Sequence, residues 1–335
     1  MLHHYTVRRM PLEGLGVSLF FVLSGYFSTF SLLRLREKVV QGELTTAGAL
    51  RLFYWRRWMR IVPVCLVVVS LAALAGVPFG REHFFSLAFF TSNFSMIREY
   101  EWFGRFSPLW SLAALEQIYL VWPLAVLCCP RRWITGFMLV CMAVAPVFLT
   151  WCHQTMQPGF VWFMVPLAWL DQIGAGALLA WCYLRGSAKH FVQITQPFAL
   201  LCVVFMVLEE CGWRPPFHAI GISSLSALLG AWVVAGAATG YSGWVAWFLE
   251  NWLLIRMGQL SYGIFLLHNF TELLIPRWGW LGAALSSDWQ FLILMPATVL
   301  LAMLMHHFIE RPILQFSRRE KGETQRQVAH GKNLH

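Results

Sequence analysis

The sequence predicts an all-α fold, a polytopic bundle of about nine transmembrane helices, from three observations. Of the 335 residues, 58% are apolar and only 12% are charged, whereas soluble domains have about 25% charged residues. The apolar residues gather in segments of the roughly 20 residues that a membrane-spanning helix needs. These segments are continuously apolar and lack the alternation of barrel strands. Together the observations exclude soluble domains, a disordered chain, a coiled coil and a disulfide-rich scaffold.

Nine segments have this length and composition. Because lipid offers no hydrogen-bond partner to a peptide group, each segment must satisfy its own backbone and is predicted to be a helix. In chain order, the predicted spans cover residues 14–33, 62–80, 108–129, 133–152, 161–184, 190–209, 217–239, 258–276 and 289–309.

Lys and Arg residues predict the orientation of the bundle, because cytoplasmic loops carry an excess of them. With alternating spans, one side of the membrane receives 18 of the 25 basic residues, in 34–60, 131–132, 185–189, Arg256 and the segment from Arg311 onward. This side is therefore predicted to be cytoplasmic, with the C-terminus inside and the N-terminus outside. Residues 1–14 do not form a signal peptide, so an outer N-terminus implies a spanning helix before Met1.

The net charge of +9 is explained by these cytoplasmic loops and by anionic lipid headgroups, so no nucleic-acid partner is predicted. Residues 47–60 are rich in Arg and aromatic residues and are predicted to form a helix at the cytoplasmic interface. Residues 1–312 are predicted to be one membrane domain, and residues 313–335 a disordered basic cytoplasmic tail. The cysteines show no CxxC or zinc spacing and are predicted to be small buried apolar residues.

Several segments carry patterns more specific than apolar length. They are Gly14–Phe27 (GLGVSLFFVLSGYF), Phe53–Pro63 (FYWRRWMRIVP), Asn93, Trp110–Pro123 (WSLAALEQIYLVWP), Leu170–Ala180 (LDQIGAGALLA), Gly258–His268 (GQLSYGIFLLH) and Ile309–Pro312 (IERP). In this order they resemble the signature segments of the acyltransferase 3 family, over residues 4–312. The resemblance implies an enzyme of the bacterial inner membrane that acylates sugars or other acceptors of the cell envelope.

Two departures from the family pattern concern candidate catalytic residues. The family carries a His ten residues after an Arg in its first helix. His4 fits that His, with His3 as the alternative, and the Arg would lie before Met1. The family usually has a Glu followed by a variable residue where this chain has Leu115–Glu116, and it stays open whether Glu116 replaces the usual carboxylate.

Acyl transfer from a thioester to a hydroxyl needs a base for the hydroxyl proton and a holder for the charged donor. His4, at the predicted outer face, suits the base because histidine exchanges protons near neutral pH; a solvated interfacial side chain is the alternative. Arg56, Arg57 and Arg60 suit the phosphates of acyl-CoA, because guanidinium groups bind phosphate through paired hydrogen bonds. Their alternative role is a positive anchor at the cytoplasmic interface.

Glu116 lies within a predicted span, where a charge costs about 2.5–3.5 kcal/mol or more and usually faces a polar cavity. A hydrogen-bond cluster between packed helices is the alternative. The other residues predicted to line this substrate cavity are Ser24, Ser111, Gln117, Tyr119, Ser261, Tyr262, His268 and Glu310. His306 and Glu310 stand four residues apart, but no HExxH motif is present, so a structural role and no metal site are predicted for them.

These patterns predict a membrane O-acyltransferase. It would move an acyl group, acetyl by preference, from cytosolic acyl-CoA to a hydroxyl of an envelope carbohydrate or similar acceptor. No permanently bound cofactor is expected, and the expected partners are the lipid bilayer, the donor and the acceptor. One alternative is a proton- or ion-coupled transporter or flippase that uses Glu116, Asp171 and His268. Another is an inactive fragment that lacks its first helix.

Overall fold

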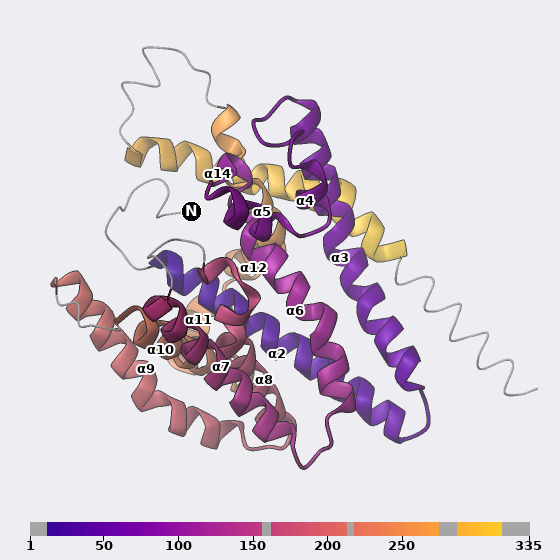
Figure 1. Cartoon of the computed structure of the whole chain (residues 1–335), viewed down its shortest axis with the longest axis vertical. Helices are drawn as coiled ribbons and strands as arrows, with labels where there is room; N and C mark the ends of the chain where they lie inside the picture. The colour runs from indigo at the N-terminus through magenta and orange to yellow at the C-terminus, as the bar shows by residue number, and fades with distance from the viewer. Residues whose placement is uncertain (1–11, 156–161, 213–217, 275–286, 317–335) are drawn as a thin grey trace, which may run out of the picture.

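The computed structural model describes residues 12–155, 162–212, 218–274 and 287–316, and throughout these residues the chain forms helices and no strand (Figure 1). The predicted all-α membrane bundle is thus confirmed. The elements are α2 (Leu12–Val40), α3 (Thr46–Leu74), α4 (Phe84–Ala88), α5 (Ser92–Glu99), η1 (Gly104–Phe106), α6 (Leu109–Cys128), α7 (Ile134–Thr155), η2 (Trp162–Met164), η3 (Pro166–Trp169), α8 (Leu170–Leu184), α9 (Ala188–Glu210), α10 (His218–Thr239), α11 (Gly243–Leu249), α12 (Trp252–Leu267), η4 (Thr271–Leu274), α14 (Ser287–Met305) and η5 (His306–Glu310).

The described part of the chain has seven helices that are long and apolar enough to cross a membrane, and an eighth if a bent pair counts as one span. The bent pair is α10 and α11, between which the chain turns by 91°. Helix α12 has 16 residues, which is shorter than the length that a perpendicular span needs. The structure therefore confirms an integral membrane protein but not the predicted count of nine spans.

Helix α3 joins two segments that the sequence predicts to be separate. It runs unbroken from Thr46 to Leu74, so residues 47–60 form its first half and not a separate interfacial helix. Its start is fixed by Thr45, whose Oγ1 accepts a hydrogen bond of 3.0 Å from the backbone N–H of Gly48. Pro63 lies inside the helix and removes one backbone donor, which membrane helices tolerate when neighbouring helices enclose the freed group.

The last described helix also extends further than predicted. The span that contains α14 and η5 continues to Phe316, so residues 313–316 are helical. The rest of the predicted tail, residues 317–335, lies outside the described residues.

Helices α2 and α8 lie side by side in the middle of the bundle, while α3 and α9 lie on opposite sides of it (Figure 1). The two central helices touch through glycines: a methyl group at Gly25 would overlap the carbonyl of Ile173, and one at Gly176 would overlap the carbonyl of Val22. Small residues at such crossings bring two backbones together, which favours helix association in a membrane. Helix α6 joins α2 through a hydrogen bond of 2.9 Å from Trp122 Nε1 to Thr29 Oγ1.

Replacing a glycine at this crossing should destabilise the bundle. We expect Gly176→Ala to lower the free energy of unfolding by about 1–3 kcal/mol, because the neighbouring atom is a backbone carbonyl that cannot rotate away. Gly136 in α7 has no atom within 4 Å of an added methyl group, so Gly136→Ala is the matched control and should be neutral or slightly stabilising. Thermal unfolding in detergent, followed by tryptophan fluorescence, compares the two variants. Equal stabilities would contradict the proposed crossing.

Candidate functional site

An ion pair between α3 and α6 lies at the centre of the candidate site. Arg57 Nε donates a hydrogen bond of 3.3 Å to Glu116 Oε1. The two side chains are only 22% and 18% exposed, so neighbouring helices enclose both charges. A single charge in this position would be costly in a membrane, and pairing with an opposite charge offsets part of that cost. Of the three arginines that the sequence proposed as phosphate ligands, Arg57 is thus the one turned into the bundle.

Tyr119 lies about one helical turn after Glu116 in α6 and contacts the same arginine. The guanidinium carbon of Arg57 lies 3.1 Å from the centroid of the Tyr119 ring, and a cation above an aromatic face is attracted by the ring quadrupole. Tyr119 is fully buried, and its hydroxyl faces Ser24 and Ser28 of α2. Three helices, α2, α3 and α6, therefore contribute polar groups to one place.

Two further elements contribute to the same place. Tyr262 of α12 donates a hydrogen bond of 2.7 Å to the backbone carbonyl of Ile61 in α3. Its hydroxyl lies within electrostatic interaction distance of Arg57, Glu116 and Glu310. Glu310 is buried and belongs to η5, a π-helical turn that follows α14.

We call these converging residues the central polar cluster: Ser24, Ser28, Arg57, Glu116, Tyr119, Tyr262 and Glu310. It brings together five of the residues that the sequence proposed as the carboxylate and the cavity lining, together with Arg57. Such a group of charges, phenols and hydroxyls enclosed by apolar helices can bind a polar substrate and stabilise charge that develops on it.

Arg56 and Arg60 are more exposed than Arg57. Both are exposed, and because they are four residues apart they lie on the same face of the helix. This arrangement leaves them accessible to an anionic ligand from outside the bundle.

Gln117 lies next to Glu116 in the sequence but does not join the cluster. Its side-chain amide pairs with that of Asn93 in α5: Gln117 Nε2 donates to Asn93 Oδ1 over 2.8 Å, and Asn93 Nδ2 donates to Gln117 Oε1 over 3.1 Å. Each amide also donates to a backbone carbonyl, of Phe90 and Met164 respectively. These contacts give Gln117 a place in the packing of α5 on α6.

The remaining cavity candidates lie elsewhere. Ser111 is buried near the start of α6 and donates a hydrogen bond of 3.0 Å to the carbonyl of Pro108. Ser261 of α12 and His268, which directly follows this helix, line a shallow and mainly apolar groove of about 440 Å³. His268 Nδ1 lies 2.7 Å from the carbonyl oxygen of Phe265. The predicted base His4, and its alternative His3, fall outside the described residues.

Asp171 has hydroxyl and amide partners that the sequence did not suggest. Its Oδ2 accepts a hydrogen bond of 3.3 Å from Ser224 of α10, and its Oδ1 accepts one of 2.9 Å from the backbone N–H of Gln172. The bond from Ser224 joins α10 to α8, and only the folded bundle brings these two residues together.

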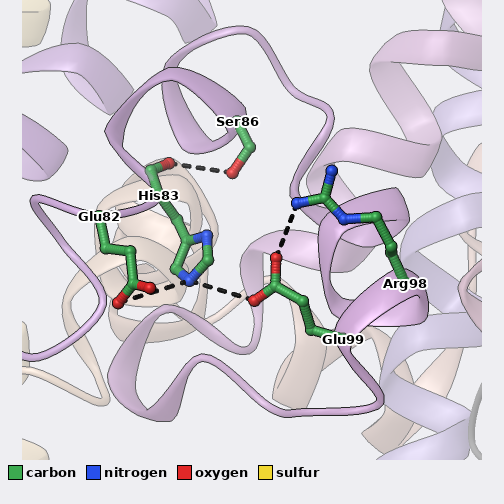
Figure 2. Close-up of polar contacts among 5 residues, drawn as sticks. All are labelled: Glu82, His83, Ser86, Arg98 and Glu99. Atoms are coloured by element: carbon green, nitrogen blue, oxygen red, sulfur yellow. Dashed lines mark hydrogen bonds and ion pairs between the residues drawn. The ribbon is translucent and has the colours of Figure 1, made fainter.

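A second polar group that the sequence did not single out lies in the segment between α3 and α6. Figure 2 shows His83 with its Nε2 3.3 Å from Glu99 Oε2 and 4.0 Å from Glu82 Oε2, while Glu99 Oε1 accepts a hydrogen bond of 2.9 Å from Arg98. The imidazole ring also stacks on Phe103, with 3.8 Å between ring centroids. These contacts hold the start of α4 against the end of α5.

The fold and the cluster define an integral membrane protein with an enclosed polar site between its helices. Comparison with known proteins gives the family. The family model described as an acyltransferase domain, that of the acyltransferase 3 family, matches residues 2–307, so the chain belongs to this family.

Curated relatives agree with this assignment. The chain is 28% identical to the peptidoglycan O-acetyltransferase OatA of Listeria monocytogenes over 328 residues, which are 89% of this chain and 51% of the relative. It is 27% identical to the putative peptidoglycan O-acetyltransferase YrhL of Bacillus subtilis, over 89% of this chain and 50% of the relative. Putative O-acetyltransferases of Staphylococcus aureus are 24% identical, over 92% of this chain and 54% of each relative. The chain thus spans about half the length of the curated relatives it matches. No solved structure gives a significant match.

Removing one partner of the Arg57–Glu116 ion pair should lower the stability of the bundle more than removing both partners. In Arg57→Met or in Glu116→Leu, one charge stays buried without its partner, and we expect a loss of about 3–5 kcal/mol in stability. The double variant leaves no lone charge, so it should be more stable than either single variant. Arg56→Met, on the exposed face of the same helix, is the control and should change stability little. Thermal unfolding in nanodiscs measures all four variants, and additive losses in the double variant would contradict a direct pairing.

Proposed function

We propose that the protein is a membrane O-acetyltransferase that moves an acetyl group from cytosolic acetyl-CoA to a hydroxyl group of an envelope carbohydrate. The family assignment and the names of the curated relatives support this activity. The observation that carries the proposal is the enclosed Arg57–Glu116 pair, which joins two helices long and apolar enough to span the membrane. Because the Listeria relative is named for peptidoglycan, peptidoglycan is the first acceptor to test.

The proposed reaction begins with the acceptor hydroxyl. A base, for which His4 is the candidate, takes the hydroxyl proton as the oxygen attacks the thioester carbonyl. A C–O bond forms, the C–S bond breaks, and coenzyme A leaves as a thiolate that takes up a proton. Arg57, held in place by Glu116 and by the Tyr119 ring, would stabilise the negative charge that develops on the carbonyl oxygen.

The donor would be held from the cytoplasmic side. In the predicted orientation, Arg56 and Arg60 lie in the cytoplasmic half of α3, and both are exposed, whereas Arg57 is partly buried. A guanidinium group forms strong, charge-assisted hydrogen bonds to phosphate. We therefore propose that Arg56 and Arg60 bind the phosphates of coenzyme A while Arg57 acts at the acyl group.

The activity is tested with the purified protein in nanodiscs, labelled acetyl-CoA and peptidoglycan fragments. We expect label to appear in an ester on the glycan, and His4→Ala to abolish its transfer while leaving the thermal stability unchanged. Transfer that survives this substitution would remove His4 from the mechanism. Flux of a glycan precursor across proteoliposomes without acetyl-CoA would instead favour a transporter.

The donor site has its own prediction. Replacing both Arg56 and Arg60 by Ala should raise the KM for acetyl-CoA by roughly tenfold or more and change kcat little, because hydrogen bonds to charged groups contribute about 1.5–3 kcal/mol each. Arg51→Ala is the matched control, since Arg51 is exposed on the same helix and lies outside this pair. Initial rates at varied acetyl-CoA concentration give both constants. A wild-type KM in the double variant would refute the proposed phosphate site.

A further inference from the structure

The π-helical turn η5 introduces a histidine–carboxylate pair beside the central polar cluster. The turn covers His306–Glu310 and lies inside a membrane span that reaches Phe316. His306 Nδ1 is 2.7 Å from Glu310 Oε2. Turns of this type are rare, and they often lie at functional sites.

The two carboxylate oxygens of Glu310 have different surroundings. Oε2 is held by His306, whereas Oε1 is buried and has no hydrogen-bond partner among the residues that the structure describes. The whole side chain is only 9% exposed. A buried acceptor without a donor is costly, so a ligand that supplies an N–H or O–H group to Oε1 would relieve that cost.

A purely structural role does not account for the pair. His306 and Glu310 belong to one helical segment, four residues apart, so their contact does not fasten one helix to another. Glu310 instead interacts electrostatically with Tyr262, as Arg57 and Glu116 also do, and its turn η5 packs against α3, the helix that carries Arg57. The carboxylate therefore lies near the place proposed for acyl transfer.

We infer that Glu310 Oε1 accepts a hydrogen bond from a substrate, and that His306 is a positioning residue that holds the carboxylate in place for it. This inference rests on the proposed function. The ligand chemistry is a neutral N–H or O–H donor. Two substrates can offer it: the pantetheine arm of acetyl-CoA has amide N–H groups, and the glycan acceptor has hydroxyl groups.

Steady-state kinetics with both substrates varied tests the inference. Glu310→Gln keeps the shape of the side chain but replaces the charged acceptor by an amide. We expect the KM of one substrate to rise roughly tenfold or more and the KM of the other to change less than about twofold. A rise for acetyl-CoA identifies the pantetheine amides as the ligand, and a rise for the glycan identifies a hydroxyl.

Variants of His306 test the positioning role. His306→Leu removes the hydrogen bond and should raise the same KM, whereas His306→Asn retains an N–H donor near the position of Nδ1 and should restore most of the affinity. His307→Leu is the matched control, because His307 is the exposed neighbour in the same turn. The combination of Glu310→Gln with His306→Leu should be no worse than Glu310→Gln alone, because the histidine acts through the carboxylate.

Three results would overturn the inference. In the first, the KM values of Glu310→Gln equal those of the His307→Leu control. In the second, both KM values of Glu310→Gln rise equally and its thermal stability falls, and in the third, His306→Asn has the same KM values as His306→Leu. Titrations with a non-hydrolysable acetyl-CoA analogue and with the glycan fragment measure binding without turnover. If the wild type transfers no acetyl group, the proposed function fails, while these titrations of wild type and Glu310→Gln still decide the inference.

Discussion

The enclosed ion pair of Arg57 and Glu116 constrains the arrangement of everything around it. A lone charge on either α3 or α6 would be costly inside a membrane, so these two helices can pack stably only in the register that brings the guanidinium to the carboxylate. The contact between the Tyr119 ring and the guanidinium group further restricts how α3 can be placed against α6. An ion pair of this kind contributes little net stability compared with apolar residues, and we therefore attribute its presence to the chemistry of the site.

The helix crossing of α2 and α8 supplies the rigidity that such a site needs. Apolar side chains gain little from leaving lipid for another apolar surface, so membrane helices associate through close packing and hydrogen bonds. Gly25 and Gly176 allow the two backbones to touch. The same crossing places Ser24 of α2 toward Tyr119, so one packing contact determines both the centre of the bundle and one wall of the cluster.

Much of the fold can be predicted from the sequence, because a long apolar segment in lipid has to be a helix. The 91° bend between α10 and α11 cannot, because apolar composition does not determine the direction of an axis. The site is also only partly predictable. Three arginines share one segment, and only the packing of α3 against α6 selects Arg57 to face inward. Gln117 follows Glu116 directly, yet it points about 100° away around the helix and meets Asn93, a partner from another element.

The same geometry shows how Leu115 and Glu116 differ in their surroundings. Leu115 is completely buried in an apolar core to which α2, α3, α6, α7 and α8 contribute, so a carboxylate there would be enclosed by apolar side chains. Glu116, one position later, points toward α3 and meets Arg57. The carboxylate that α6 carries at this position is thus paired with the arginine of α3. We therefore propose that Glu116 orients Arg57 for chemistry, and that the arginine and the carboxylate act as a pair.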